Sequence, residues 1–345
     1  MQWKCGESNS RAQHPRQTGG AISRAQHFPL AALLAAGLFV LAPFVVPGWV
    51  LFLLTVALAK FMAVLGVALF LRGGLVTFGH ALFYAVGAYT AGFGSKWFGV
   101  RDAVLLVPLG MVLGALVAAL VGLFIARYRG VFFSMLNLAL SMILYAILLK
   151  FYWITSGTDG ISVRVPTLLG FVPPRDALRL VYYYFTLAVT GAATYAVHRF
   201  LASPLGFFLK ALADNEIRIE YSGESVQRVI YSTYVLAGAL GGLGGVLVAF
   251  AVGHIVPEYA FWLQSGEFVF IALLGGYSSV PGPLIGAIAF EFIRTYANKY
   301  APYAWQMTLG IIMLLIILLQ PGGLWAMYER VASRFSRRAE GVRHA

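Results

Sequence analysis

Three ionisable residues lie inside or next to strongly apolar stretches of the 345-residue sequence: Lys60, Glu267 and Glu291. A charge at bilayer depth is costly, so such residues are candidates for an ion or substrate path wherever the stretches span a membrane. Glu291 has Arg294 one turn later, a pairing that also fits a purely structural role. Lys60 has no partner nearby in the sequence, and its role stays open.

A second candidate for chemistry is the acidic stretch of residues 201–228, LASPLGFFLKALADNEIRIEYSGESVQR. Ser203 followed by Pro204 is a typical helix start, with the hydroxyl as N-cap. Asp214 or Asn215 is suited to cap a second helix, and Gly223 is suited to end it. The sequence therefore predicts a folded helical loop between two apolar stretches.

The second helix of this loop has two predicted faces. One is a packing face that repeats every four residues, formed by Ala213, Ile217 and Tyr221. The other is an acidic stripe, formed by Glu216, Glu220 and Glu224. Presentation to a water-soluble partner and a solvated helix lying on the lipid headgroups both fit this pattern, and both stay open.

Polar side chains also interrupt the marginally hydrophobic stretch 75–94, LVTFGHALFYAVGAYTAGFG. A helix of this composition is poorly suited to facing lipid, and its small residues allow close helix approach. We therefore expect it inside a bundle, next to a transport path whose candidate residues are Thr77, His80, Tyr84 and Tyr89. A structural histidine is the alternative for His80, and no metal site is predicted.

The apolar stretch that follows the acidic loop contains two interleaved GxxxG pairs, Gly238 with Gly242 and Gly241 with Gly245. Such pairs bring helix backbones into tight contact, so we predict helix packing here. A mobile hinge is the alternative.

The composition places these residues in a membrane protein. Hydrophobic residues make up 60% and charged residues 11% of the chain, against about 25% charged residues in soluble domains, and the mean hydropathy is +0.80. The net charge of +12 is scattered over short loops, which argues against nucleic-acid binding. Cys5 is the only cysteine, so neither an intrachain disulfide nor a cysteine metal cluster is predicted.

The sequence lacks the patterns GxxxxGK[ST], HExxH and GxSxG. We therefore predict no P-loop, no catalytic residues and no cofactor of the chain's own, so that any ATP is used by partner subunits.

Ten apolar segments are candidate transmembrane helices: 28–46, 49–71, 75–94, 103–126, 131–151, 180–198, 229–252, 266–279, 283–297 and 303–320. The sequence Val280-Pro281-Gly282-Pro283 separates two short ones, with a kinked span or re-entrant hairpin as the alternative. With the N-terminus inside, sixteen of the 25 basic residues are cytoplasmic, eight are external and Lys60 lies in a span. This bias predicts an all-α polytopic membrane protein with both termini and the acidic loop in the cytoplasm.

The predicted organisation has three parts. Residues 1–27 form a disordered basic tail, residues 28–320 the transmembrane permease domain, and residues 321–345 an arginine-rich cytoplasmic tail. Residues 152–179 form the longest external loop, and Asp159 lies in a stretch whose residues are typical of a turn. This loop is a docking surface or lid in one interpretation and a plain connector held by an Asx turn in the other.

Three stretches together resemble the permeases of branched-chain amino acid ABC transporters, the LivM/LivH family, and its LivM-type branch best. The stretch GLVTFGHA followed by GAYTA is similar to the family's GxLSLGHAAFFxxGAYTAA, and RGVFF followed by TDGI is similar to RGxYFA and TGGxDGL. The third stretch, SPLG through ADNE to AGALGGLGG, is similar to SPxGRxLxAIRENExxAxxxG and SGxLAGLAG. The match covers roughly residues 50–325.

The resemblance implies a subunit of an importer in a bacterial inner membrane. It would work with a second related permease, two cytoplasmic ABC ATPases and a periplasmic or lipid-anchored substrate-binding protein. Residues around Ala213 to Gly223 would then dock on an ATPase, through Ala213, Asp214, Asn215, Glu216, Ile217, Glu220 and Gly223. Here the chain reads ALADNE, which makes the loop more acidic than is usual in the family.

The leading hypothesis is thus a permease for branched-chain or related small amino acids. A permease of the same family for urea or short amides is the close alternative. A carrier that acts alone on an ion gradient, with Glu267, Glu291 or Lys60 as the coupling group, is the alternative from another class.

Overall fold

The computed structural model describes residues 37, 39–171, 174–319, 322–327 and 330. The chain divides into two compact units, Met1–Val46 and Pro47–Ala345. In the first unit residues 39–45 are helical. The predicted tail 1–27, most of segment 28–46 and nearly all of the tail beyond 327 lie outside the described residues.

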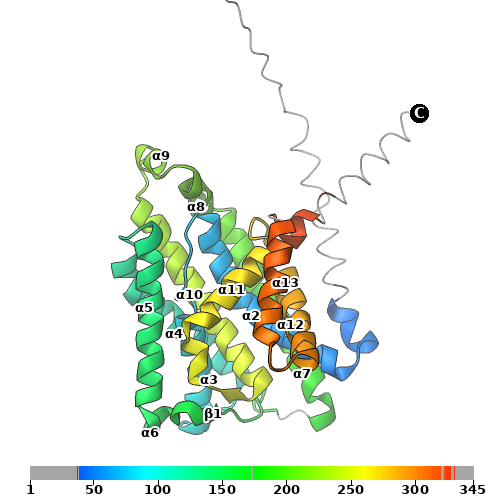
Figure 1. Cartoon of the computed structure of the whole chain (residues 1–345). Coiled ribbons are helices and arrows are strands. Elements are labelled where there is room, and N and C mark those ends of the chain that lie inside the picture. Colours follow the sequence, from blue (N-terminus) through cyan, green and yellow to red (C-terminus); the bar gives the residue numbers. More distant parts are fainter. Residues whose placement is uncertain (1–36, 38, 172–173, 320–321, 328–329, 331–345) are drawn as a thin grey trace, which may run out of the picture. The chain divides into compact units, whose positions relative to one another are not determined.

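Long apolar helices make up most of the second unit (Figure 1): α2 (Gly48–Arg72), α4 (Ala103–Ile125), α5 (Gly130–Lys150), α7 (Arg175–Leu201) and α10 (Val226–Val252). Over the described residues, these five are long and apolar enough to cross a membrane. The chain is therefore an all-α, multi-pass membrane protein, as its composition predicts.

Shorter helices complete the bundle: α3 (Ala81–Lys96), α11 (Trp262–Gly275), α12 (Gly282–Tyr300) and α13 (Trp305–Leu319). α11 and α12 are separate helices, which confirms the predicted break before Pro283. The break begins at Gly276, whose φ of 94° is open to glycine but strained for other residues.

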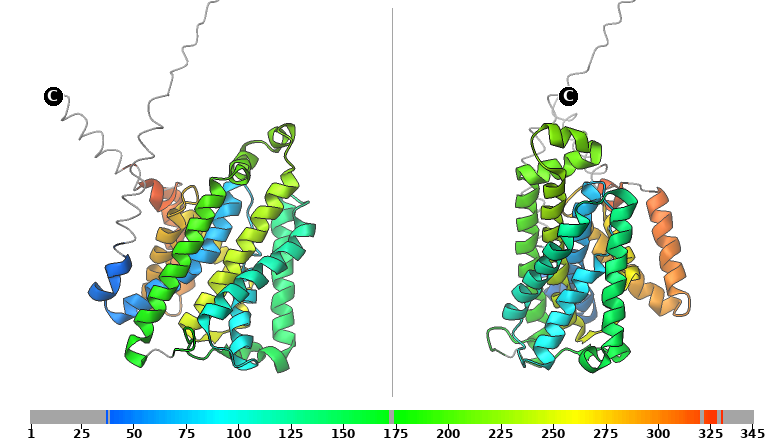
Figure 2. Two further views of the ribbon diagram at one scale, coloured as in Figure 1. Left: turned by 180° about the vertical axis from the view of Figure 1, so that it is seen from behind. Right: turned by 90° about the vertical axis from the view of Figure 1, so that its left-hand side faces the viewer.

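Helices α2 and α10 occupy the centre of this unit. α10 packs against α2, α3 and α4, while α7 runs alongside α2 (Figure 2). α4 buries one stripe of small residues at four-residue spacing, Gly110, Gly114, Ala118 and Gly122. The opposite side of α4 exposes large apolar side chains such as Leu116 and Leu120, as expected of a helix that faces lipid.

The expected helix over 75–94 is shorter than predicted, because helix α3 begins only at Ala81. The chain reverses after α2 through Gly74, whose φ is +70°, and then runs without regular structure to His80. Irregular backbone at membrane depth is tolerated where protein surrounds it. Thr77 and His80 are buried, and the Ala81 N–H donates to Ser265 Oγ of α11 at 2.8 Å. Helix α3 therefore starts inside the bundle.

The loop 152–179 is tied down at several points. It contains α6 (Tyr152–Thr155), the 3₁₀ turn η1 (Gly157–Asp159) and strand β1 (Ile161–Ser162), which pairs antiparallel with β2 (His254–Ile255). Asp159 accepts a hydrogen bond from the Tyr152 hydroxyl at 3.1 Å, which raises the pKa of that phenol. No backbone N–H among the described residues caps the Asp159 carboxylate, so the predicted Asx turn is replaced by this side-chain contact.

Candidate functional site

Two of the four predicted packing glycines of α10 face α4. A methyl group at Gly238 would meet the Ala118 Cβ and, at 2.9 Å, the Gly114 carbonyl oxygen. A methyl group at Gly242 would meet the Gly110 carbonyl oxygen and would lie 3.1 Å from the Gly114 Cα. The two helices are therefore in close backbone contact, which leaves no room for a side chain at Gly238 or Gly242.

The other two glycines face α3. A methyl group at Gly241 would lie 2.8 Å from the Phe83 Cβ and 3.2 Å from His80 Nε2. One at Gly245 would meet the Tyr84 carbonyl oxygen and would lie 2.7 Å from the Ala88 nitrogen. The two interleaved pairs thus form two packing seams, one for α4 and one for α3.

The four candidate path residues are all buried, but they do not converge on one cavity. Thr77 Oγ1 accepts a long hydrogen bond of 3.4 Å from the Gly79 N–H. His80 has no exposed surface, and neither ring nitrogen has a hydrogen-bond partner among the described residues. Its ring is instead enclosed by Phe70, Phe83 and Phe268, with ring centres 5.7–6.4 Å away. This placement fits a packed histidine.

Tyr84 and Tyr89 point to different surroundings. The Tyr84 ring packs on Tyr259 and Phe268, with centroid distances of 5.4 and 5.1 Å. Tyr89 lines an apolar cavity of about 390 Å³ between α3, α4 and α5, together with residues such as Phe93 and Leu113. The Tyr89 hydroxyl is buried without a partner among the described residues.

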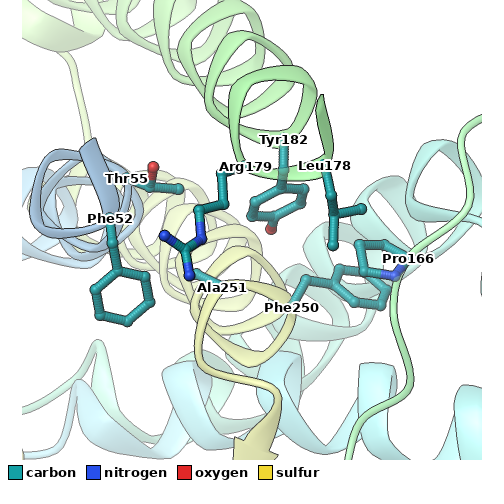
Figure 3. Close-up of a pocket in the computed structure, with 8 residues that line it drawn as sticks. All are labelled: Phe52, Thr55, Pro166, Leu178, Arg179, Tyr182, Phe250 and Ala251. Atoms are coloured by element: carbon teal, nitrogen blue, oxygen red, sulfur yellow. The ribbon is translucent and has the colours of Figure 1, made fainter. Parts of the chain in front are cut away.

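A smaller cavity of about 80 Å³ lies between α2, α7 and the end of α10. Figure 3 shows Arg179 extending from α7 into it, between Phe52 and Tyr182. The Tyr182 hydroxyl donates to the Leu247 carbonyl oxygen at 2.7 Å, so its polar end is satisfied. None of the described residues that line this cavity offers Arg179 a second charged group.

The densest polar feature is a cluster of four charged side chains that joins α2, α11 and α12. Lys60 Nζ donates to Glu267 Oε1 at 2.9 Å. Glu291 Oε1 lies 2.7 Å from the same nitrogen, as an ion pair without a well-directed hydrogen bond. Arg294 Nη1 donates to Glu267 Oε1 at 3.2 Å. We call these four residues the charge cluster.

Two points in the charge cluster differ from the sequence-based expectation. Lys60 has two partners, both more than 200 residues away in the chain. The expected pairing of Glu291 with Arg294 is wrong, because Arg294 reaches Glu267 on the adjacent helix instead. Glu291 and Arg294 are three residues apart and so share a face of α12. The Glu291 carboxylate nevertheless pairs with Lys60 of α2.

Aromatic rings flank the two cations of the charge cluster. Lys60 Nζ lies 5.9 Å from the centre of the Phe290 ring, and Arg294 Cζ lies 5.5 Å from that of Trp305 on α13. Such cation–π contacts stabilise charges held away from water. Over the described residues, no group of three or more His, Cys, Asp or Glu side chains is placed to hold a metal.

The acidic loop forms two helices, α8 (Pro204–Asp214) and α9 (Glu216–Tyr221), at one end of the unit (Figure 1). Asn215 separates them with extended backbone, and its side-chain oxygen accepts from the Ile217 N–H at 3.0 Å. Gly223 has φ of +81° just beyond α9. At the start of α8, Ser203 donates to the Phe200 carbonyl oxygen and does not cap the helix, contrary to expectation.

The predicted packing face of the acidic loop is wrong. Because the chain breaks at Asn215, Ala213 belongs to α8 and the residues after the break start a new phase. Ile217 is 61% and Tyr221 89% exposed, whereas Ile219 is the buried residue of α9 at 1%. The loop therefore presents large apolar side chains to its surroundings.

Two of the three glutamates in the predicted stripe are paired within the chain. Glu216 Oε2 accepts from Arg129 Nε at 3.2 Å, and Glu224 Oε1 from Arg228 Nη1 at 2.9 Å. Glu220 is exposed, as is Asp214 at the end of α8.

Comparison with known proteins assigns the chain to a protein family. The family model described as "Branched-chain amino acid transport system / permease component" matches residues 49–318, from the first turn of α2 to the end of α13. The chain belongs to this permease family. The motifs noted in the sequence lie in the segment that leads into α3 and in α3 itself, at the start of α5, in the turn before β1, in the acidic loop and in α10.

Relatives of this permease include both branches of the family. The high-affinity branched-chain amino acid transport system permease protein LivM of Escherichia coli (strain K12) is 28% identical over 275 residues, which cover 74% of this chain and 64% of that protein. LivH of the same strain is 27% identical over 269 residues, covering 73% and 85%. The chain thus spans just under two thirds of the length of the first of these relatives.

A relative with another named cargo also matches. The nucleoside ABC transporter permease protein NupB of Lactococcus lactis subsp. cremoris (strain MG1363) is 30% identical over 146 residues, 42% of this permease and 35% of that protein. No solved structure gives a significant match.

Sequence reasoning missed one further buried contact in this permease. Asn137 of α5 accepts a hydrogen bond from the Tyr234 hydroxyl of α10 at 2.5 Å, and its amide nitrogen donates to the Phe133 carbonyl oxygen. The lone asparagine within an apolar stretch was the available signal, since a buried amide needs partners.

Proposed function

We propose that this permease is the transmembrane subunit of an ABC importer for branched-chain or related small amino acids. The family match over 49–318 carries the proposal. The charge cluster supports it in a second way, because buried polar groups in the middle of a helix bundle are typical of a path for a polar cargo. The importer resides in a bacterial inner membrane.

We propose a topology of ten transmembrane helices, two of them short, with both termini in the cytoplasm. The charge bias of the loops supports this orientation. It places the acidic loop in the cytoplasm and the paired strands β1 and β2 outside. Helices α11 and α12 then count as two separate passes.

In this arrangement α8 and α9 dock on one of two ABC ATPase subunits, and the faces of the bundle meet a second related permease and an external binding protein. The exposed Ile217 and Tyr221 support docking, since large apolar side chains at a projecting helix are typical of protein contacts. Glu220 beside them offers a charge for a basic partner surface. The chain itself binds no ATP.

The test of the function is reconstitution in proteoliposomes with the second permease, the ATPases and the binding protein. We expect leucine uptake that requires ATP inside and all subunits. Urea and a nucleoside, assayed in the same vesicles, identify a different cargo. Uptake by this chain alone, driven by an ion gradient, would refute the proposal.

The docking role of the acidic loop is tested by Glu220→Lys combined with Tyr221→Ala. We expect uptake and stimulated ATP hydrolysis to fall at least tenfold, while the purified chain keeps its melting temperature. Glu216 is left intact because its reversal would also break the contact with Arg129. The control is Tyr303→Ala, a fully exposed tyrosine in the turn between α12 and α13, outside the acidic loop. Equal effects of the two variants would exclude docking through α9.

A further inference from the structure

The charge cluster lies in the middle of the membrane. Lys60 stands twelve residues after Gly48 and twelve before Arg72, the two ends of α2. At 1.5 Å per residue this is about 18 Å from either end of the helix, close to the centre of a hydrocarbon layer about 30 Å thick. The other three charges are in contact with Lys60 or with its partner, so they lie near the same depth.

The charge cluster has a closed half and an open half. The side chains of Lys60 and Glu291 are only 7% and 8% exposed. Those of Glu267 and Arg294 are 18% and 33% exposed. A charge that is partly exposed at this depth does not face lipid, because hydrocarbon offers it no compensation. The open half therefore faces water or another protein.

The two halves also differ in how their charges are satisfied. If Glu267 turns away from Lys60, Glu291 still lies 2.7 Å from the Lys60 nitrogen. Glu267 likewise keeps Lys60 if its contact with Arg294 opens. Arg294 has no second carboxylate within salt-bridge distance among the described residues, and its contact of 3.2 Å with Glu267 is the longest in the cluster. The pair that most readily changes partners is thus the one that is open. The Trp305 ring packs against the Arg294 guanidinium, and among the described residues only Glu267 accepts a hydrogen bond from it.

Charge balance limits the ligands that fit. Lys60 and Arg294 offset Glu267 and Glu291, so the cluster carries no net charge. A zwitterion that inserts between Glu267 and Arg294 gives its carboxylate to the arginine and its ammonium group to the glutamate. Every charge stays paired, whereas a net cation or anion would leave one charge unpaired, which is expensive away from water.

We propose that the open half, Glu267 and Arg294, is a zwitterion-binding site in the transport path, a proposal that rests on the proposed importer function. Arg294 binds the carboxylate through its planar guanidinium, which suits a two-pronged contact. Glu267 binds the ammonium group. Lys60 and Glu291 position Glu267 and keep the site neutral when the ligand leaves.

Access to the site is tested by thiol labelling of the permease–ATPase complex in proteoliposomes, on a background in which Cys5 is replaced by serine. Gln264→Cys places a thiol one turn before Glu267, and Thr295→Cys is a second reporter beside Arg294. The control is Leu120→Cys on α4, 64% exposed toward lipid. We expect charged thiosulfonate reagents to modify the first two and not the third.

The class of ligand is tested by adding candidate ligands to the complex without the binding protein. A ligand that occupies the site should protect the two reporter cysteines from the same thiosulfonate reagents. We expect leucine to slow labelling at least threefold, and 3-methylbutylamine and 4-methylpentanoate, which lack one of its charges, to have no effect. Absence of labelling at both reporters in the complex, with labelling of the isolated chain, would show that the partner permease covers the cluster and would overturn the proposal. Protection by 3-methylbutylamine and 4-methylpentanoate equal to that by leucine would also overturn the proposal.

A double variant separates binding from folding. Glu267→Gln with Arg294→Gln removes the open pair without leaving a lone charge, so we expect a melting temperature near that of the parent and loss of leucine protection. Protection that survives the double variant would contradict the assignment. Failure of the importer function has a different signature, namely no ATP-driven uptake by the unmodified complex even though labelling and protection of the cluster are observed.

Discussion

The seam between α10 and α4 predicts that Gly242→Ala is strongly destabilising. The added methyl group would lie 3.1 Å from both the carbonyl carbon of Gly110 and the Cα of Gly114, and closer still to the Gly110 carbonyl oxygen. These are backbone atoms, which have no rotamer with which to move aside. Helix α4 would have to retreat by several tenths of an ångström or more, and packing along the whole seam would loosen.

Two effects of opposite sign set the magnitude. Alanine favours a helix over glycine by about 1 kcal/mol, while overpacking costs about 1–3 kcal/mol or more. With backbone atoms as the obstacle we take the upper end, which leaves a net loss of about 2 kcal/mol. The matched control is Gly191→Ala on α7, an exposed position where a methyl group meets nothing within 4 Å. There only the gain of about 1 kcal/mol remains.

The assay is thermal unfolding of the purified chain in detergent, followed by tryptophan fluorescence. At about 2–4 °C per kcal/mol, we expect Gly191→Ala to melt about 6–12 °C above Gly242→Ala, with the parent in between. If Gly242→Ala melts at or above the control, the α10–α4 backbone contact does not exist and the seam is wrongly placed.

Three further variants test other contacts by the same unfolding assay. Lys60→Met leaves the buried Glu291 carboxylate without a cation and Glu267 with Arg294 alone, and it should cost about 3–5 kcal/mol. Adding Glu291→Gln should restore part of the loss, and an absence of any restoration would contradict the ion pair. Tyr234→Phe deprives the buried Asn137 oxygen of its hydrogen-bond donor and should cost about 1–3 kcal/mol. The control is Tyr231→Phe on the same helix, whose hydroxyl makes no hydrogen bond among the described residues and whose loss should cost less than half of that. Asn215→Ala removes the cap of α9, worth about 0.5–2 kcal/mol of helix stability, and should speed backbone amide exchange in residues 217–221 but not in α8; unchanged exchange in both would rule out the cap.

The fold followed from patterns that act locally. Length and hydropathy predict α2, α4, α5, α7 and α10, because a membrane span needs about 20 apolar residues whatever surrounds it. Proline and glycine between α11 and α12 predict the break, since backbone conformation decides it at that point. Residues 75–80 were misassigned as helix for the converse reason: their irregular path depends on burial against α5 and α11, which hydropathy does not encode.

The contacts between distant residues were beyond sequence reasoning. The GxxxG spacing predicts that α10 packs tightly, but only the structure assigns Gly242 to α4 and Gly245 to α3. Both partners of Lys60 lie more than 200 positions away in the sequence. Pairing at a distance requires knowledge of which helices adjoin, whereas the predicted pair within α12 relied on spacing alone and was wrong.

A further glycine contact of α10, made by Gly244, and the charge cluster meet on α2. A methyl group at Gly244 of α10 would lie 2.8 Å from the Ala59 carbonyl oxygen and 3.2 Å from the Ala63 nitrogen, the turn of α2 that carries Lys60. On its other side the same turn holds Glu267 and Glu291 through the Lys60 ammonium group. Helix α2 is therefore clamped at mid-depth between backbone contact on one face and ion pairs on the other. The backbone contact with α10 is fixed by packing, whereas the ion pairs can exchange partners. Movement at this level of the bundle should therefore occur between α2 and the pair α11–α12, while the α2–α10 contact persists.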